Sequence, residues 1–100
     1  KPTPVPAVPG SFGKGLPKAG ATVASGSQTF SWSASRGATG YQWCLSTTNG
    51  SCAAWSPVTT SRSVKLVLAA GTTYYWQVRA VNGIGTTDAD AGSWWSVATR

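Results

Sequence analysis

The chain has 100 residues, which suits one domain with a single hydrophobic core. Eight residues are basic and two are acidic, giving a net charge of +6, but the basic residues stand singly, whereas nucleic-acid binders cluster them on one face. With no histidine, two acids and no apolar run of membrane-spanning length, the sequence argues against an enzyme, a nucleic-acid binder and an inserted membrane protein.

Residues 1–9 read KPTPVPAVP, and four prolines at this spacing favour an extended polyproline II conformation. One interpretation is a semi-rigid linker between domains. The other is an N-terminal arm whose Val5 and Val8 pack on exposed aromatic rings of a neighbouring copy or domain. In both cases the folded domain is expected over residues 10–100. With no initiating methionine and no visible signal peptide, we expect the chain to be part of something longer.

Three segments in the first half of the domain are predicted to be strands. Residues 10–22 are glycine-rich and suggest an irregular first strand, whereas 28–33 and 41–46 alternate apolar and polar side chains as half-buried strands do. The side chains expected to face the core are Phe12, Leu16, Phe30, Trp32, Tyr41, Trp43 and Leu45.

Cys44 and Cys52 are the only cysteines. A zinc site needs more ligands than they supply, so we expect a disulfide, which indicates an oxidising compartment. A tight Asn-Gly turn at 49–50 would place Cys52 opposite Thr47, and the disulfide is expected to prevail over that turn. Residues 49–51 also fit a glycosylation sequon, which in a bacterial protein would be an unmodified turn.

The second half begins with two predicted strands, 51–58 and 64–68. The next predicted strand is 71–82, with the sequence GTTYYWQVRAVN, and the rest of the domain is expected to pack around it. Its phase is fixed by Gln77 and Arg79, because burying an amide and a charge without partners is costly. The side chains expected to face the core on 64–68 and 71–82 are Val64, Leu66, Leu68, Tyr74, Trp76, Val78 and Ala80.

Residues 82–92 are predicted to be a loop, and 93–100 the last strand, with Trp95 and Val97 facing inward and Trp94 outward. The acids Asp88 and Asp90 fall in the loop, where they are solvated or form a weak Ca²⁺ site. Counting the first strand, the sequence predicts seven strands and no helix, which is typical of a two-sheet sandwich.

The sequence resembles the fibronectin type III family. The residues that carry the resemblance are Leu68, the Gly-Thr turn at 71–72, Tyr74, the alternation that follows, and Trp32, Tyr41, Trp43 and Val97. It implies a seven-stranded antiparallel immunoglobulin-like sandwich, with Tyr74 as the tyrosine corner. The match is closest to bacterial secreted and surface members, which are mostly non-catalytic. Lys65 departs from the pattern, because the family has an apolar residue there, so a bulge or one-residue shift is expected.

These observations favour a non-catalytic extracellular or cell-surface module, with no cofactor or metal, that contacts neighbouring copies or domains of the same protein. It could be the repeating unit of a fibre. The alternative is a carbohydrate-binding module, because outward-facing aromatic rings can stack on sugars. The residues expected to make the polysaccharide or protein contact are Trp55, Tyr75, Arg79 and Trp94.

Overall fold

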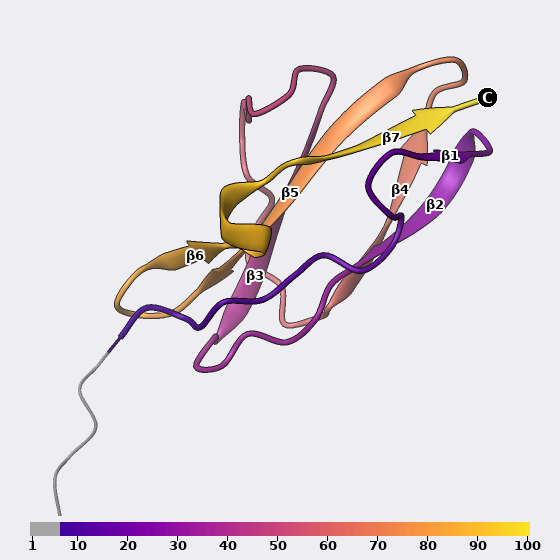
Figure 1. The fold of residues 1–100 in the computed structure, drawn as a ribbon. Coiled ribbons are helices and arrows are strands. Elements are labelled where there is room, and N and C mark those ends of the chain that lie inside the picture. The colour runs from indigo at the N-terminus through magenta and orange to yellow at the C-terminus, as the bar shows by residue number, and fades with distance from the viewer. Residues whose placement is uncertain (1–6) are drawn as a thin grey trace, which may run out of the picture.

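A computed structural model describes residues 7–100, which form two β-sheets facing each other across one core (Figure 1). One sheet has the order β1-β7-β5-β3, and β6 pairs with the C-terminal end of β5 in the same sheet. The other sheet consists of β2 and β4. The elements are β1 (Ala21–Val23), β2 (Gly26–Ser31), β3 (Gly40–Ser46), β4 (Ser63–Leu68), β5 (Thr73–Val81), β6 (Thr86–Asp88), the 3₁₀ turn η1 (Ala89–Gly92) and β7 (Trp95–Thr99). Among these residues no helix is long and apolar enough to cross a membrane.

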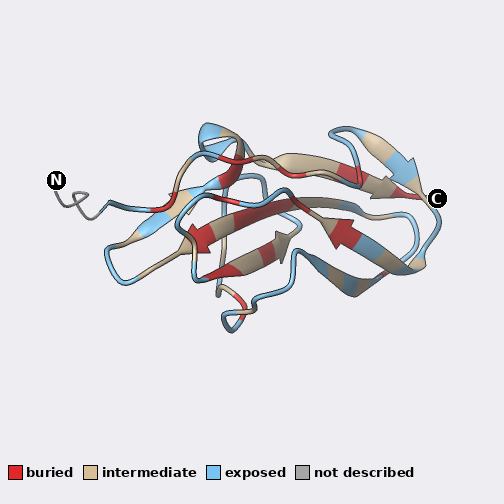
Figure 2. Cartoon of the chain, turned by 90° about the horizontal axis from the view of Figure 1, so that it is seen from below, coloured by how far each residue is buried: buried red, intermediate tan, exposed pale blue. Residues whose placement is uncertain are grey.

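The predicted phase of β5 is correct. Trp76, Val78 and Ala80 are almost completely buried against the second sheet, and Tyr74 is half-buried at the edge of the core. The Tyr74 hydroxyl accepts a hydrogen bond from the backbone N–H of Ala69 at 2.9 Å, which is the bond expected of a tyrosine corner. Buried positions are concentrated in the middle of β5, from Trp76 to Ala80, with only Arg79 half-buried among them (Figure 2).

The rest of the core largely follows the sequence pattern, with one exception. Leu16 is 55% exposed and does not plug the core, because the chain turns outward at this point. Trp43, Leu45 and Trp95 are half-buried but pack on the core from its margins. The other predicted core residues that are buried are Phe12, Phe30, Trp32, Tyr41, Leu68 and Val97.

The first part of the chain belongs to both sheets in turn. Lys14 forms an antiparallel bridge with Trp32, and the following backbone pairs with the end of β2. The chain then crosses over, and β1 runs parallel to β7, with Ala21 opposite Val97. The larger sheet is therefore mixed, and the prediction of a wholly antiparallel sandwich was wrong in this respect.

Three other expectations about strands need correction. Residues 51–58 form no regular strand, and only an isolated bridge joins Tyr41 to Thr59. The predicted loop at 82–92 contains β6, which pairs with β5. Between β2 and β4 the register is continuous, so Lys65 causes no bulge and simply faces outward opposite Thr29.

Candidate binding surface

Three of the four predicted contact residues meet on the outer face of the larger sheet. Arg79 points away from the core because it alternates with Val78 and Ala80 on β5. Its guanidinium carbon lies 4.3 Å from the centre of the Trp55 ring. The Trp55 and Trp94 ring centres are 6.4 Å apart and their planes are tilted by 49°. We refer to Trp55, Arg79 and Trp94 as the tryptophan–arginine cluster.

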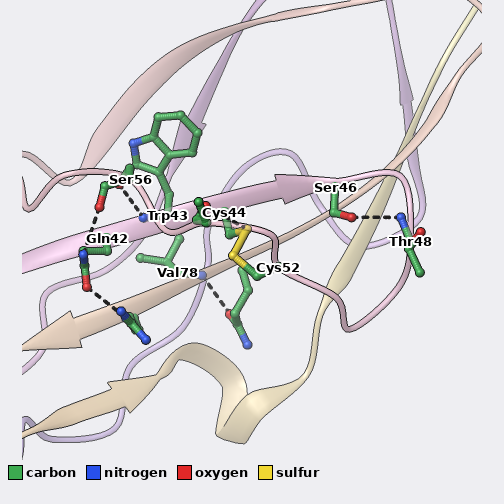
Figure 3. Close-up of a disulfide and its surroundings, with 11 residues drawn as sticks. Gln42, Trp43, Cys44, Ser46, Thr48, Cys52, Ser56 and Val78 are labelled. Atoms are coloured by element: carbon green, nitrogen blue, oxygen red, sulfur yellow. Dashed lines mark hydrogen bonds between the residues drawn. A yellow bond between two sulfur atoms is a disulfide. The ribbon is translucent and has the colours of Figure 1, made fainter.

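Hydrogen bonds hold this cluster on the sheet. The Arg79 Nε–H donates to the Gln42 side-chain oxygen at 2.9 Å, and the Gln42 amide donates to the Ser56 carbonyl at 2.9 Å. Ser56 is itself tied to β3, because its N–H donates to the Trp43 carbonyl and its hydroxyl accepts from the Trp43 N–H. These bonds fix the segment that carries Trp55, and Figure 3 shows Gln42 and Ser56 beside β3.

Tyr75 is not part of the cluster. It lies on the same face of β5, between Ser46 on β3 and Ser96 on β7, and it is half-buried. Within residues 7–100 its ring makes no aromatic or cation contact with Trp55 or Trp94. A ligand on the cluster would therefore not need Tyr75.

The predicted disulfide is present, joining Cys44 on β3 to Cys52 (Figure 3). Cys44 is only 3% exposed although it faces outward, because the segment after residue 50 covers it. The tight turn also forms, with the Ser51 N–H donating to the Thr48 carbonyl. Turn and disulfide coexist because residues 51–58 leave the strand path, which removes the register conflict that a paired strand would impose.

Reduction of this disulfide should lower the free energy of unfolding by about 2.5 kcal/mol, because a short closed loop no longer restricts the unfolded chain. Urea denaturation of the oxidised and reduced protein measures the difference. A Cys44→Ala, Cys52→Ala double variant is the control and should not respond to the reductant. Two free thiols in the native protein under non-reducing mass spectrometry would contradict the disulfide.

The described part of the N-terminal arm lies on its own domain. Val8 reaches the β5–β6 hairpin, where a Cβ atom added at Gly85 would be 2.9 Å from a Val8 methyl group. The Asn82 side chain donates to the Ala7 carbonyl, and the Thr87 hydroxyl donates to the Pro9 carbonyl. Val8 thus lies at the β5–β6 hairpin of its own domain, and Val5 lies outside the described residues.

A second cluster, not foreseen from the sequence, surrounds Lys14. The Lys14 side chain is completely buried, and its ammonium lies 2.7 Å from the Asp90 carboxylate. It also donates to the Gln77 side-chain oxygen at 2.9 Å and to the Ser93 carbonyl at 2.6 Å. The Trp95 ring centre is 5.0 Å away. We call Lys14, Gln77, Asp90 and Ser93 the Lys14 site.

Alongside the Asp90 side chain, which is 24% exposed, Gln77 is a buried polar member of the Lys14 site. It faces away from the core, as predicted, but it is fully buried, because η1 and Lys14 cover it. Its amide donates to the Ala89 and Ser93 carbonyls, and its oxygen accepts from Lys14. The partners that the sequence did not reveal therefore come from distant parts of the chain.

Burial lowers the pKa of the Lys14 ammonium, and the hydrogen bond and charge of Asp90, with a contribution from Asp88, partly oppose that shift. Asp90 adopts a left-handed backbone conformation with φ of 54°, and its carboxylate also accepts from the Lys14 N–H. Because its Oδ2 atom is already paired with the Lys14 ammonium, that positive charge disfavours a Ca²⁺ ion at this carboxylate. Within residues 7–100 no three His, Cys, Asp or Glu side chains are grouped as metal ligands.

Comparison with known proteins gives the fold. No family model and no curated protein matches the sequence. An Fn3-like protein from Clostridium thermocellum superposes with a TM-score of 0.65 at 23% identity, covering 95% of this chain and 94% of that one. FN3tt gives 0.58 at 19% identity, covering 92% and 97%, and FN3tt mut gives 0.59 at 20%, covering 94% and 100%. Together with the tyrosine corner and the two-sheet sandwich, these matches show that the chain has a fibronectin type III-like fold.

Proposed function

We propose that the chain is a non-catalytic structural module of a bacterial extracellular or cell-surface protein. The observation that carries the proposal is the position of the two ends of the domain. The first described residues lie beside β6, and the C-terminus lies at the opposite end of the sandwich (Figures 1 and 2). Modules with ends so placed can be joined in series without bending the chain back. The disulfide and the Fn3-like fold support an oxidising, extracellular setting.

Immunolabelling of intact cells of the source organism tests the location. An antibody against this domain should label intact cells or the medium as strongly as lysed cells, and a cytoplasmic protein should be labelled only after lysis. Labelling that depends on lysis would overturn the extracellular assignment.

A finer form of the proposal is that copies follow one another as the repeating unit of a fibre. Its support is the proline-rich sequence of residues 1–6, which is typical of a semi-rigid spacer, directly before residues anchored on β6. Deleting residues 1–6 leaves the anchoring bond at Pro9 in place, so the domain should still fold. Electron microscopy should then show that fibres formed by the full chain are lost. Fibres that persist unchanged would end this form of the proposal.

A second candidate function is carbohydrate binding, and the tryptophan–arginine cluster favours it. Trp55 and Trp94 are half-exposed, so a sugar ring could stack on the free part of their surfaces, and the Arg79 guanidinium is suited to a carboxylate. The positive net charge makes a uronic-acid polysaccharide a better partner than a neutral one.

Glycan-array binding tests this candidate with a matched pair of variants. Trp94→Ala should weaken binding to uronic-acid glycans by about tenfold or more, as expected when an aromatic anchor is lost. Tyr75→Ala removes an aromatic ring from the same face but outside the cluster, so it should bind as the unaltered protein does. Equal loss in both variants, or no binding by the unaltered protein, would exclude this function for the cluster.

A further inference from the structure

The first and last segments of the domain run side by side in the same direction. We call residues 7–23 and 85–100 the terminal pair. The Thr87 hydroxyl donates to the Pro9 carbonyl, and the Asp90 N–H donates to the Phe12 carbonyl at 2.9 Å. Further along, Gly20 bonds to Ser96 and the pairing continues through β1 and β7. Figure 1 shows the N-terminal segment following the path from β6 past η1 to β7.

The direction of this pairing decides how a pull on the chain ends would act on it. One end of the domain lies beside β6 and the other beyond β7, so tension draws the two segments past each other (Figure 1). The bonds of a parallel pair lie across the strands at even spacing, so several must break together. In a hairpin pulled open from its end, the same bonds break one at a time.

The Lys14 site lies in the middle of the terminal pair and ties its two members together. The buried ammonium of Lys14 comes from the first segment, whereas Asp90 and Ser93 belong to the last. Sliding the segments would separate the ammonium from Asp90 and Ser93 while it is still surrounded by protein, which is a costly state for a charge. This site is therefore placed to resist the motion that tension produces.

The first segment of the terminal pair, 7–23, also connects the pair to the second sheet. Lys14 forms a bridge with Trp32, and the Gly15 N–H donates to the Ser31 carbonyl at 2.7 Å. A load on the first segment is thus shared by both sheets instead of acting on one strand.

From this arrangement we propose that the terminal pair is a tension-bearing clamp, locked by the Lys14 site. The proposal rests on the structural role proposed above and says what that role is: the module carries mechanical load along a chain of domains. The load would enter at the β6 end and leave after β7.

Single-molecule force spectroscopy tests the clamp. The domain is placed between marker domains and pulled in two ways, from its two termini and from a handle at Ala70→Cys with the C-terminus. Ala70 is exposed and Gly71 bonds to Arg100, so the second geometry opens β7 from its end. The unaltered domain should unfold at clearly higher force when it is pulled from its termini. Equal or lower force in that geometry would overturn the clamp.

Lys14→Met tests the lock, because it keeps the apolar stem and removes the ammonium. Under tension between the termini it should unfold about tenfold faster, whereas opening from Ala70 should be unchanged. The matched control is Lys18→Met, at an exposed lysine in the following turn, which should behave as the unaltered domain in both geometries. Equal weakening in both geometries would show a general loss of stability and would reject the lock.

The two levels of the proposal can fail separately. If Lys14→Met does not fold, the comparison of the two pulling geometries in the unaltered domain still decides whether the clamp exists. If the clamp proves weak, the extracellular assignment is unaffected, because cell labelling tests that assignment separately. A cytoplasmic location would leave the measured clamp intact but remove its proposed role.

Discussion

Trp76→Ala should lower the free energy of unfolding by about 3–5 kcal/mol, the range found when a large aromatic side chain is truncated in a core. Trp76 is 1% exposed and lies at the centre of the sandwich. Its ring meets Phe30 edge-on at 4.9 Å and Trp95 edge-on at 6.2 Å between centres. Truncation leaves a cavity between the two sheets that these rings cannot fill without leaving their own contacts. Urea denaturation with a fixed slope measures the loss.

The matched control is Tyr75→Ala, one residue earlier on the same strand. Tyr75 is half-buried on the outer face, so its removal opens no internal cavity and should cost much less. A milder change, Trp76→Phe, should also cost less than Trp76→Ala, because the indole N–H has no hydrogen-bond partner among the described residues and its removal loses no bond. Equal losses from Trp76→Ala and Tyr75→Ala would contradict the assigned phase of β5.

The phase of β5 could be predicted because alternation reports which side chains are buried. Gln77 and Arg79 indicate which face of β5 points outward. Val78 and Ala80 lie on the opposite face and are fully buried. The same signal gave the inward faces of β2, β3, β4 and β7. It also indicated a surplus of outward aromatic rings, Trp55, Tyr75 and Trp94, of which the structure brings the two tryptophans together with Arg79.

Alternation does not report which strand pairs with which, and the corrected expectations come from this limit. The residues of β6 are Thr, Thr and Asp, with no apolar face to announce a strand, yet β6 pairs with β5 through its backbone. The parallel pairing of β1 with β7 depends on where the chain crosses between sheets after Leu16. Residues 51–58 had strand-like composition, but the disulfide and the Ser56 bonds hold them in an irregular path.

The Lys14 site lay beyond sequence reasoning for a different reason. Lys14 and Asp90 are 76 residues apart, and nothing near either of them marks the other as its partner. A single lysine in a glycine-rich segment is usually solvated. Gln77 was correctly placed on the outer face, but its burial depends on η1 folding over it, which requires left-handed residues that the sequence ADAG does not announce.

Asp90→Asn should lower the free energy of unfolding at neutral pH by about 3 kcal/mol, because it leaves the buried Lys14 ammonium without a counter-charge. Asparagine keeps an oxygen that can accept the Lys14 N–H, and it tolerates the left-handed backbone at this position. The variant therefore removes the charge and little else. Asp88→Asn is the control, since it makes the same change in net charge at an exposed residue and should cost little.

The pH dependence of this loss separates a buried charge from a packing defect. Burial already lowers the pKa of Lys14 in the folded protein, and Asp90→Asn removes the carboxylate that opposes this shift, while Asp88 remains. Between the lowered pKa and the ordinary value of the unfolded chain, the unfolded state binds more protons, so stability rises with pH. Below the lowered pKa the full cost of the buried charge applies. The deficit of Asp90→Asn relative to the unaltered protein should thus be largest near neutral pH and shrink as the pH rises towards the ordinary pKa of lysine. Urea midpoints across that range measure it, and a deficit that stays constant or grows with pH would reject the buried, uncompensated ammonium as its cause.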